Sequence, residues 1–168
     1  MVRACKALLV GATGLYLALV AFNNVTDYGS NLQFVQHVLS MDTTFPGNAL
    51  LWRAIRAPWV HHAFYVTIIA WEIRSAVLLL LGAWRLWAAR RAPRAFVAAK
   101  GLALLGLTSN LLQWLVAFLT VGGEWFAMWQ SNVWNGSETA GRMFTVVGIV
   151  LLFVSAPESE GPAPEVTA

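Results

Sequence analysis

Two charged residues, Glu72 and Arg74, stand in the middle of a long apolar stretch of the sequence. In a membrane span each would cost about 2.5–3.5 kcal/mol on insertion scales, and intramembrane carboxylates are often functional. Positions two apart on a helix are separated by a rotation of about 200°, so these two side chains cannot pair with each other. Each therefore needs a partner on another helix.

A second apolar stretch supplies Asn110 and Gln113, which share one helical face at i and i+3 and reach a depth similar to that of Glu72. We expect Glu72, Asn110 and Gln113 to form an intramembrane polar cluster, with Arg74 either joining it or reaching a partner protein. One interpretation is that interhelical hydrogen bonds fix helix pairing, at about 0.6–2 kcal/mol each. The other is a site that handles a proton, a lipid or a quinone.

Composition indicates which kind of chain carries these residues. Of its 168 residues, 58% are hydrophobic and 11% are charged, whereas a soluble domain has roughly a quarter charged residues. The single Cys5 excludes an internal disulfide framework and a cysteine metal site. The sequence therefore predicts a one-domain membrane protein, whose basic residues orient it in a bilayer rather than bind nucleic acid.

Hydropathy predicts an all-α membrane protein, a bundle of four transmembrane helices. A spanning helix needs about 20 mostly apolar residues. The fourth predicted helix must carry Arg142, which can pair with Glu138 four residues earlier and extend its charged end toward the membrane surface. We expect Asn135 to be the N-cap of this helix. The predicted spans, all within one domain of residues 1–155, lie at about 4–22, 63–84, 101–121 and 136–155.

Basic residues set the expected orientation of the bundle. Arg and Lys cluster near the N-terminus and over 85–100, whereas the connection 122–135 carries none. By the positive-inside rule, both termini are cytoplasmic, and the segments 23–61 and 122–135 lie on the outer face. Residues 156–168 are rich in Pro and Glu and are predicted to form a disordered cytoplasmic tail.

The two outer segments are expected to lie at the membrane surface. In the first, Ser30 can cap a short amphipathic helix, and Leu50 to Ile55 forms a second one. The second segment is predicted to be an interfacial anchor, because indole rings favour the headgroup boundary; its alternative role is to bind another subunit or a headgroup. Its residues of interest are Glu124, Trp125, Met128, Trp129, Trp134 and Asn135, with Trp125, Met128 and Trp129 expected on one helical face.

Three histidines, His37, His61 and His62, fall in or near the outer layer. Haem ligation needs two facing histidines at matched depth, which only His37 with one of the other two could supply. Hydrogen-bonded interfacial histidines are the simpler interpretation. The sequence shows no nucleotide-binding loop, catalytic triad or zinc spacing, so we predict no catalytic residue, metal or resident cofactor, with haem or quinone kept as alternatives.

Two unusual stretches carry a family resemblance. GGEWFAMWQSNVWNG at 122–136 and NNVTDYGSNLQFVQHVLSMDTTFP at 23–46 resemble a bacterial family of predicted small integral membrane proteins, a domain of unknown function with four predicted spans. The likeness runs from Lys6 to about Leu152. It implies the four-helix architecture and a place in the bacterial inner membrane, and it brings no catalytic residues.

These observations leave two functional hypotheses. The first is a non-catalytic integral membrane subunit that contacts membrane lipids and stabilises a larger bacterial inner-membrane complex. Aromatic-rich outer surfaces and charged groups at mid-depth favour such contacts. The second is a small lipid-, quinone- or proton-handling membrane protein that uses the polar cluster around Glu72.

Overall fold

The structure is a computed structural model that describes residues 1–158. Every secondary-structure element in that range is helical, which confirms the predicted all-α class. Four helices are long and apolar enough to cross a bilayer: α1, Val2–Thr26; α3, Pro58–Ala89; the continuous helix Pro93–Trp125; and α5, Ser137–Ser155. The four predicted spans correspond to these four helices, most of which continue several residues beyond the expected bounds.

The third span changes its winding along its length. It begins as the α-helix α4, Pro93–Leu112, and continues as the π-helix η2, Gln113–Trp125. The backbone N–H of Phe126 donates to the carbonyl of Val121 at 3.0 Å, a separation of five residues that fits this wider winding. π-Helical segments are rare, usually span a single turn, and are frequent at functional sites.

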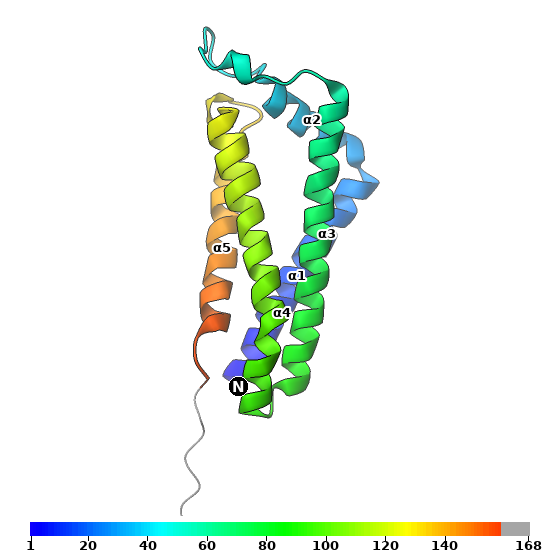
Figure 1. The fold of residues 1–168 in the computed structure, drawn as a ribbon, viewed down its shortest axis with the longest axis vertical. Coiled ribbons are helices and arrows are strands. Elements are labelled where there is room, and N and C mark those ends of the chain that lie inside the picture. Colours follow the sequence, from blue (N-terminus) through cyan, green and yellow to red (C-terminus); the bar gives the residue numbers. More distant parts are fainter. Residues whose placement is uncertain (159–168) are drawn as a thin grey trace, which may run out of the picture.

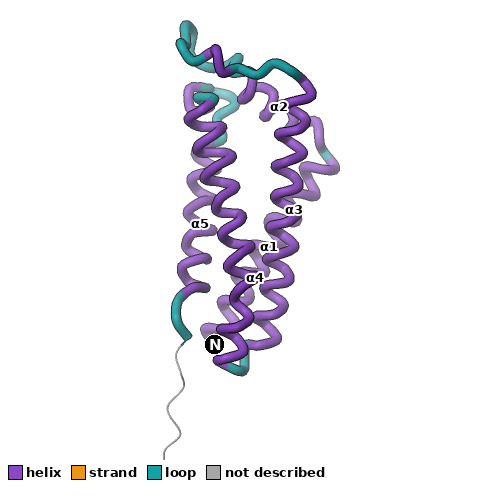
Figure 2. Tube along the Cα trace, in the orientation of Figure 1, coloured by secondary structure: helices purple, strands orange, loops and turns teal. Residues whose placement is uncertain are grey.

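The connections and short helices gather at the ends of the bundle (Figure 2). One end holds α2, Tyr28–Ser40, together with the single turns η1, Leu51–Arg53, and η3, Met128–Gln130. We call this the capped end, and define it as α2 with residues 41–57 and 126–136. The opposite end, which holds the N-terminus and the turn at 90–92, is the basic end (Figure 1).

Proline starts two of the spans. Pro58 and Pro93 occupy the first turn of α3 and α4, where the missing N–H costs no hydrogen bond and the fixed φ suits a helix. The connection between these helices is only residues 90–92. The expected connection over 85–100 was too long, because both helices continue past the length needed to cross the hydrocarbon layer.

The bundle is packed most closely in the half nearer the basic end. A Cβ on Gly82 of α3 would lie 2.7 Å from the backbone nitrogen of Ala103 in α4. A Cβ on Gly106 of α4 would lie 2.9 Å from Cγ of Leu79. Small residues therefore let these two helices approach closely, as is common in membranes, whereas toward the capped end α3 and η2 diverge (Figure 1).

Helix α1 runs obliquely behind α4 and α3, so that its C-terminal part lies on the far side of α3 from α5 (Figure 1). The chain then turns back through α2, which packs on α3 at the capped end. Val35 and Leu39 of α2 join Tyr65, Ile69 and Phe126 in one buried apolar cluster. This cluster is separate from the main core shared by α1, α3, α4 and α5.

The short outer helices differ in detail from the prediction. Helix α2 begins at Tyr28, and the Ser30 hydroxyl donates to Oδ2 of Asp27 at 2.7 Å instead of capping a later start. The expected helix from Leu50 to Ile55 is reduced to the single turn η1. A segment this short buries too little apolar surface to hold a longer helix at the membrane boundary.

Two features expected at the fourth span also differ. The N-cap is Gly136 rather than the expected Asn135, whose side chain accepts a hydrogen bond from the backbone N–H of Ser137 at 3.0 Å. The expected pair of Glu138 with Arg142 is not formed among the described residues, because Arg142 donates to the hydroxyl of Thr139 at 3.3 Å. Exposed i, i+4 ion pairs contribute only about 0.3–0.5 kcal/mol, so either partner is easily replaced.

The tail predicted to be disordered began at residue 156. The structure describes its first three residues, and Ala156 and Glu158 make hydrogen bonds and ion pairs at the basic end. That part of the prediction is corrected, because buried lysines hold these residues in place. Residues 159–168 lie outside the described range.

Candidate functional site

Glu72 lies near the middle of α3 with only 3% of its surface exposed. Asn24 of α1 donates from Nδ2 to one carboxylate oxygen at 2.8 Å, and Gln113 of η2 donates from Nε2 to the other at 3.5 Å. A buried carboxylate needs such donors, because leaving water without them is costly. Three of the four spans therefore meet at Glu72.

Asn24 extends this network toward the capped end. Its Oδ1 accepts a hydrogen bond from Asn31 Nδ2 of α2 at 2.6 Å, and its backbone carbonyl accepts one from the Tyr65 hydroxyl of α3 at 3.2 Å. Side chain and backbone of one residue thus bind α1 to its two neighbours. Asn24 is the central residue of this hydrogen-bond network, and the sequence prediction missed it.

A signal for Asn24 was present in the sequence. Buried positions of α1 recur at alternating spacings of three and four, and Asn24 continues this stripe as its last member. The stripe consists of Val10, Gly14, Leu17, Ala21 and Asn24. The predicted span ends at residue 22, which assigns Asn24 to the following connection although it lies on the buried face of α1.

The predicted polar cluster forms only in part. Glu72 and Gln113 come together, but the amide atoms of the fully buried Asn110 have no hydrogen-bond partner within residues 1–158. Arg74 is exposed on α3, and its side chain makes no polar contact within that same range. Arg74 therefore does not join the cluster, and its contact with a partner protein stays a prediction.

A cavity of about 330 Å³ lies against the polar network. Its lining is mostly apolar and comes from α1, α2, α3, η2 and the start of α5. The apolar walls include Val20, Phe34, Val35, Ile68, Trp114 and Phe118, and the polar wall includes Asn24, Asn31, Tyr65 and Glu72. A few polar groups placed in an apolar space of this size are typical of a small-molecule site.

The cavity follows from the way in which the helices diverge. It lies in the half of the bundle nearer the capped end, where α3 separates from η2 and α1 leans away from α5 (Figure 1). A second cavity of about 40 Å³ shares Phe34, Val35, Ile68 and Phe118 with the first. The two spaces therefore adjoin, and aromatic side chains form the partition between them.

The π-helix begins at the point where the third span reaches Glu72. Gln113 is its first residue, and Trp114, its second, lines the cavity. Gln113 itself keeps α-helical dihedral angles, with φ of −60° and ψ of −48°, so the wider winding affects the residues that follow it. Gln113 reaches Glu72, whereas the amide of Asn110, one turn earlier, has no hydrogen-bond partner in the described range.

The aromatic segment after η2 is not the continuous helical face that was expected. The helix ends at Trp125, and the chain turns at Ala127 in the left-handed conformation, with φ of 50°. Met128 is consequently buried, whereas Trp125 and Trp129 are about half exposed. The prediction that Trp125, Met128 and Trp129 share one face is wrong, because this turn breaks the helical period.

This segment instead packs against the first outer connection. Trp125 contacts Trp52 edge to face, and the guanidinium of Arg53 lies 4.6 Å from the Trp125 ring. Trp129 meets Phe45 edge to face. Together these contacts tie the two outer connections into one cap.

The remaining residues predicted at this surface have different environments. Trp134 stacks on His37 with ring centroids 4.6 Å apart, and Asn135 lines the main cavity. Glu124 is exposed. Only Asn135 therefore belongs to the cavity, and the aromatic residues form the cap above it.

The three histidines have separate partners at the capped end. His37 pairs with Asp42 at 2.9 Å, the Nε2 of His61 hydrogen-bonds the carbonyl of Ile55 at 2.8 Å, and His62 hydrogen-bonds the Tyr28 hydroxyl at 2.9 Å. Each ring thus has its own local partner. Nor do the described residues include a group of three or more His, Cys, Asp or Glu side chains that could hold a metal ion.

The carboxylate of Glu72 can accept further hydrogen bonds. An ionised carboxylate offers about four acceptor positions, and the 3.5 Å contact from Gln113 lies at the long limit of a hydrogen bond. A ligand with a hydroxyl or amine donor and an apolar body matches this wall and the rest of the lining. The arrangement offers binding chemistry, and the lining includes two acid–base groups, the Glu72 carboxylate and the Tyr65 hydroxyl.

Comparison with known proteins gives a family and no named activity. Residues 2–157 match the family described as predicted small integral membrane protein (DUF2165). Neither the curated proteins nor the solved structures contain a match to this chain.

Proposed function

Because the chain belongs to this family of predicted small integral membrane proteins, we propose that it binds an amphipathic small molecule of lipid or quinone type in the cavity beside Glu72. The observation that supports this most is the lining of the cavity, which is mostly apolar but carries a group of polar side chains around Glu72, with Asn135 and Thr139 as further polar residues near the start of α5. A polar head would hydrogen-bond Glu72 or Asn31, and the apolar body would pack on Phe34 and Phe118. The bilayer supplies molecules with this composition.

Filling the cavity tests the proposal directly. Val20 lines the cavity and Val25, on the same helix, is exposed outside it. The protein, Val20→Trp and Val25→Trp would each be purified in mild detergent, and the bound small molecules extracted and identified by mass spectrometry. We expect one enriched species in the unchanged protein and in Val25→Trp, and its loss from Val20→Trp. Equal content in all three would contradict the proposal.

A second variant tests the polar recognition. Glu72→Gln keeps the size of the side chain but replaces one acceptor oxygen by a donor. A folded variant that loses the enriched species supports recognition of a donor on the ligand by the carboxylate. If a folded variant retains the bound species unchanged, the role of Glu72 is limited to its hydrogen bonds with Asn24 and Gln113.

A second candidate function is that of an accessory subunit in a larger membrane complex, and Arg74 favours it. This side chain is exposed at the middle of the 32-residue helix α3, about 23 Å from either helix end at 1.5 Å per residue. The only mid-span carboxylate among the described residues is Glu72, which is buried. A neighbouring helix with an acidic residue would offset the cost of Arg74 in lipid.

The accessory role has its own matched pair of variants. Arg74→Leu removes the mid-span charge, whereas Arg85→Leu makes the same change on an exposed residue of α3 near the basic end. On native gels of solubilised membranes, a stoichiometric complex should be lost with Arg74→Leu and kept with Arg85→Leu. Migration of the unchanged protein without any partner would contradict this role.

We further propose that the protein resides in the bacterial inner membrane with its basic end in the cytoplasm. The support is the gathering of Arg and Lys at that end, which follows the positive-inside rule. Single cysteines at residues 92 and 130 in a chain without Cys5 would report the orientation. An impermeant maleimide added to intact cells should label 130 and spare 92, and labelling of both would contradict the arrangement.

A further inference from the structure

The buried carboxylate of Glu72 has no basic partner. It forms no ion pair within residues 1–158, and the hydrogen bonds to it come from the neutral amides of Asn24 and Gln113. Residues 159–168, which lie outside the described range, contain no Lys, Arg or His. A carboxylate in such apolar surroundings is costly without a compensating cation.

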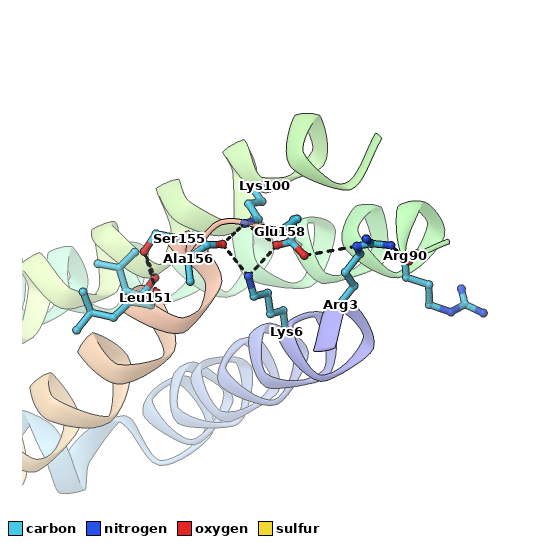
Figure 3. Close-up of polar contacts among 9 residues, drawn as sticks. Arg3, Lys6, Arg90, Lys100, Leu151, Ser155, Ala156 and Glu158 are labelled. Atoms are coloured by element: carbon cyan, nitrogen blue, oxygen red, sulfur yellow. Dashed lines mark hydrogen bonds and ion pairs between the residues drawn. The ribbon is translucent and has the colours of Figure 1, made fainter. Parts of the chain in front are cut away.

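Another buried carboxylate of the chain has the opposite environment. At the basic end, the side chain of Glu158 is only 6% exposed, and one of its oxygens lies 2.7 Å from Nζ of both Lys6 and Lys100 (Figure 3). Side chains of the protein itself thus compensate this negative charge. For Glu72, a compensating charge has to come from a molecule bound in the cavity beside it.

Aromatic side chains from three elements line this cavity of about 330 Å³. The ring centroids of Trp114 and Phe118 in η2 lie 4.8 Å apart, and the Tyr65 hydroxyl is held by the backbone of Asn24 at 3.2 Å. The cation–π contacts within residues 1–158 all involve other rings. The aromatic residues of the lining are Phe34, Tyr65, Trp114 and Phe118.

The remaining polar lining is neutral. Among the described residues that line the cavity there is no Lys, Arg or His, so no basic side chain in that lining repels a positive ligand. Asn31, Asn135 and Thr139 are exposed and also line the cavity, which places its opening near the capped end. A positive ligand would thus meet two amides and a hydroxyl where it enters.

A carboxylate among aromatic rings is suited to an organic cation. A positive charge is attracted to the face of an aromatic ring, and aromatic cages bind quaternary ammonium groups in this way. A metal ion fits less well, because Glu72 is the only carboxylate in the described lining and hard cations take six or more oxygen ligands. The apolar part of the lining also matches a carbon body rather than a hydrated ion.

We propose that the ligand of this cavity is an organic cation, with a protonated amine or quaternary ammonium head between the Glu72 carboxylate and the aromatic rings. The apolar body of the ligand packs on Phe34, Val35 and Ile68. This ligand class presupposes the function proposed for the cavity and narrows it to exclude quinones, whose head carries no positive charge.

The test compares two probes of the same shape. Phenyltrimethylammonium has a cationic head, and in tert-butylbenzene a carbon atom replaces the charged nitrogen. Each would be titrated into the purified protein in mild detergent, and its affinity obtained from the rise of the unfolding midpoint with free probe concentration. The variants are Glu72→Gln and Phe118→Leu, with Glu124→Gln and Phe22→Leu as controls, because these two residues are exposed and do not line the cavity.

We expect the unchanged protein to bind phenyltrimethylammonium about tenfold more tightly than tert-butylbenzene, given the strength of cation–π contacts removed from water. Glu72→Gln should abolish this preference and Phe118→Leu should reduce it, whereas both controls should keep it. If Glu72→Gln does not fold, Phe118→Leu and the comparison of the two probes on the unchanged protein still decide the result.

Equal affinity for the two probes would overturn the cationic ligand and leave the cavity as a site for neutral amphiphiles, so the proposed function would stand. Binding of neither probe would overturn it as well, and the extraction experiment with Val20→Trp then decides the proposed function separately. A preference that persists in both Glu72→Gln and Phe118→Leu would locate the bound cation elsewhere and also contradict the proposal.

Discussion

At the scale of single residues, the structure depends on how it accommodates buried charge. Glu72 is held by amides from two other helices, and Asn24 supplies the shorter of these hydrogen bonds at 2.8 Å. Such a hydrogen bond contributes about 0.5–1.5 kcal/mol, and leaving a buried partner unsatisfied costs about 1–3 kcal/mol. The position of Glu72 therefore depends most on Asn24.

Asn24→Ala should lower the stability of the protein by about 1–3 kcal/mol, because Glu72 and Asn31 each lose a hydrogen-bond partner. The matched control is Asn23→Ala, since Asn23 is exposed next to it on α1. Thermal unfolding in detergent would measure both. Equal midpoints for the two variants would show that the network around Glu72 carries little stability.

Glu158 makes a pH-dependent contribution at the basic end. Its pKa in the folded protein lies below the ordinary value of 4.5, since hydrogen bonds and charge from Lys100 and Lys6 outweigh the effect of burial. The carboxylate therefore adds stability that is complete well above pH 4.5. That stability is lost as the pH falls through the lowered folded-state value.

The stability difference between the protein and Glu158→Gln should accordingly be constant near neutral pH and vanish in acid. Thermal unfolding of both proteins across this pH range measures it. Glu124→Gln serves as the control, because Glu124 is exposed and its removal should leave the midpoint nearly unchanged. A difference for Glu158→Gln that is independent of pH would assign its effect to packing rather than to the ion pairs.

At the scale of elements, the close approach of α3 and α4 near the basic end sets how the helices are arranged toward the capped end. Gly82→Ala would place a Cβ 2.7 Å from the Ala103 backbone, so we expect a loss of about 1–3 kcal/mol from overpacking. Gly101→Ala on α4 meets nothing within 4 Å and should be neutral or slightly stabilising, since alanine is the better helix former. Unfolding midpoints of the two variants that do not differ would contradict the contact.

Sequence patterns predicted the elements better than their ends. Each span could be located because a run of about 20 mostly apolar residues indicates a helix that crosses the membrane. The burial of Glu72 and Gln113 followed from the cost of polar groups in lipid. The π-helix from Gln113 and the left-handed turn at Ala127 were not predictable, since neither position carries a glycine or proline signal. The turn at Ala127 explains why Met128 is buried.

At the scale of the whole molecule, the bundle is narrow at one end and open toward the other. Close packing at Gly82 and the oblique path of α1 leave the space beside Glu72, which α2 and residues 126–136 then cover (Figure 1). No local pattern predicts such a cavity, because it depends on the angles between helices far apart in sequence. The ion pair at the basic end has the same origin, since Glu158 meets Lys6 across 152 residues.

The most direct test is an experimental structure of the protein crystallised from a lipid phase. The predicted result is continuous density for a bound molecule between α1 and α5, with a polar atom within hydrogen-bond distance of Glu72 or Asn31. A structure in which Phe34 and Phe118 close the space, with Glu72 turned away from Asn24, would contradict the proposed binding function.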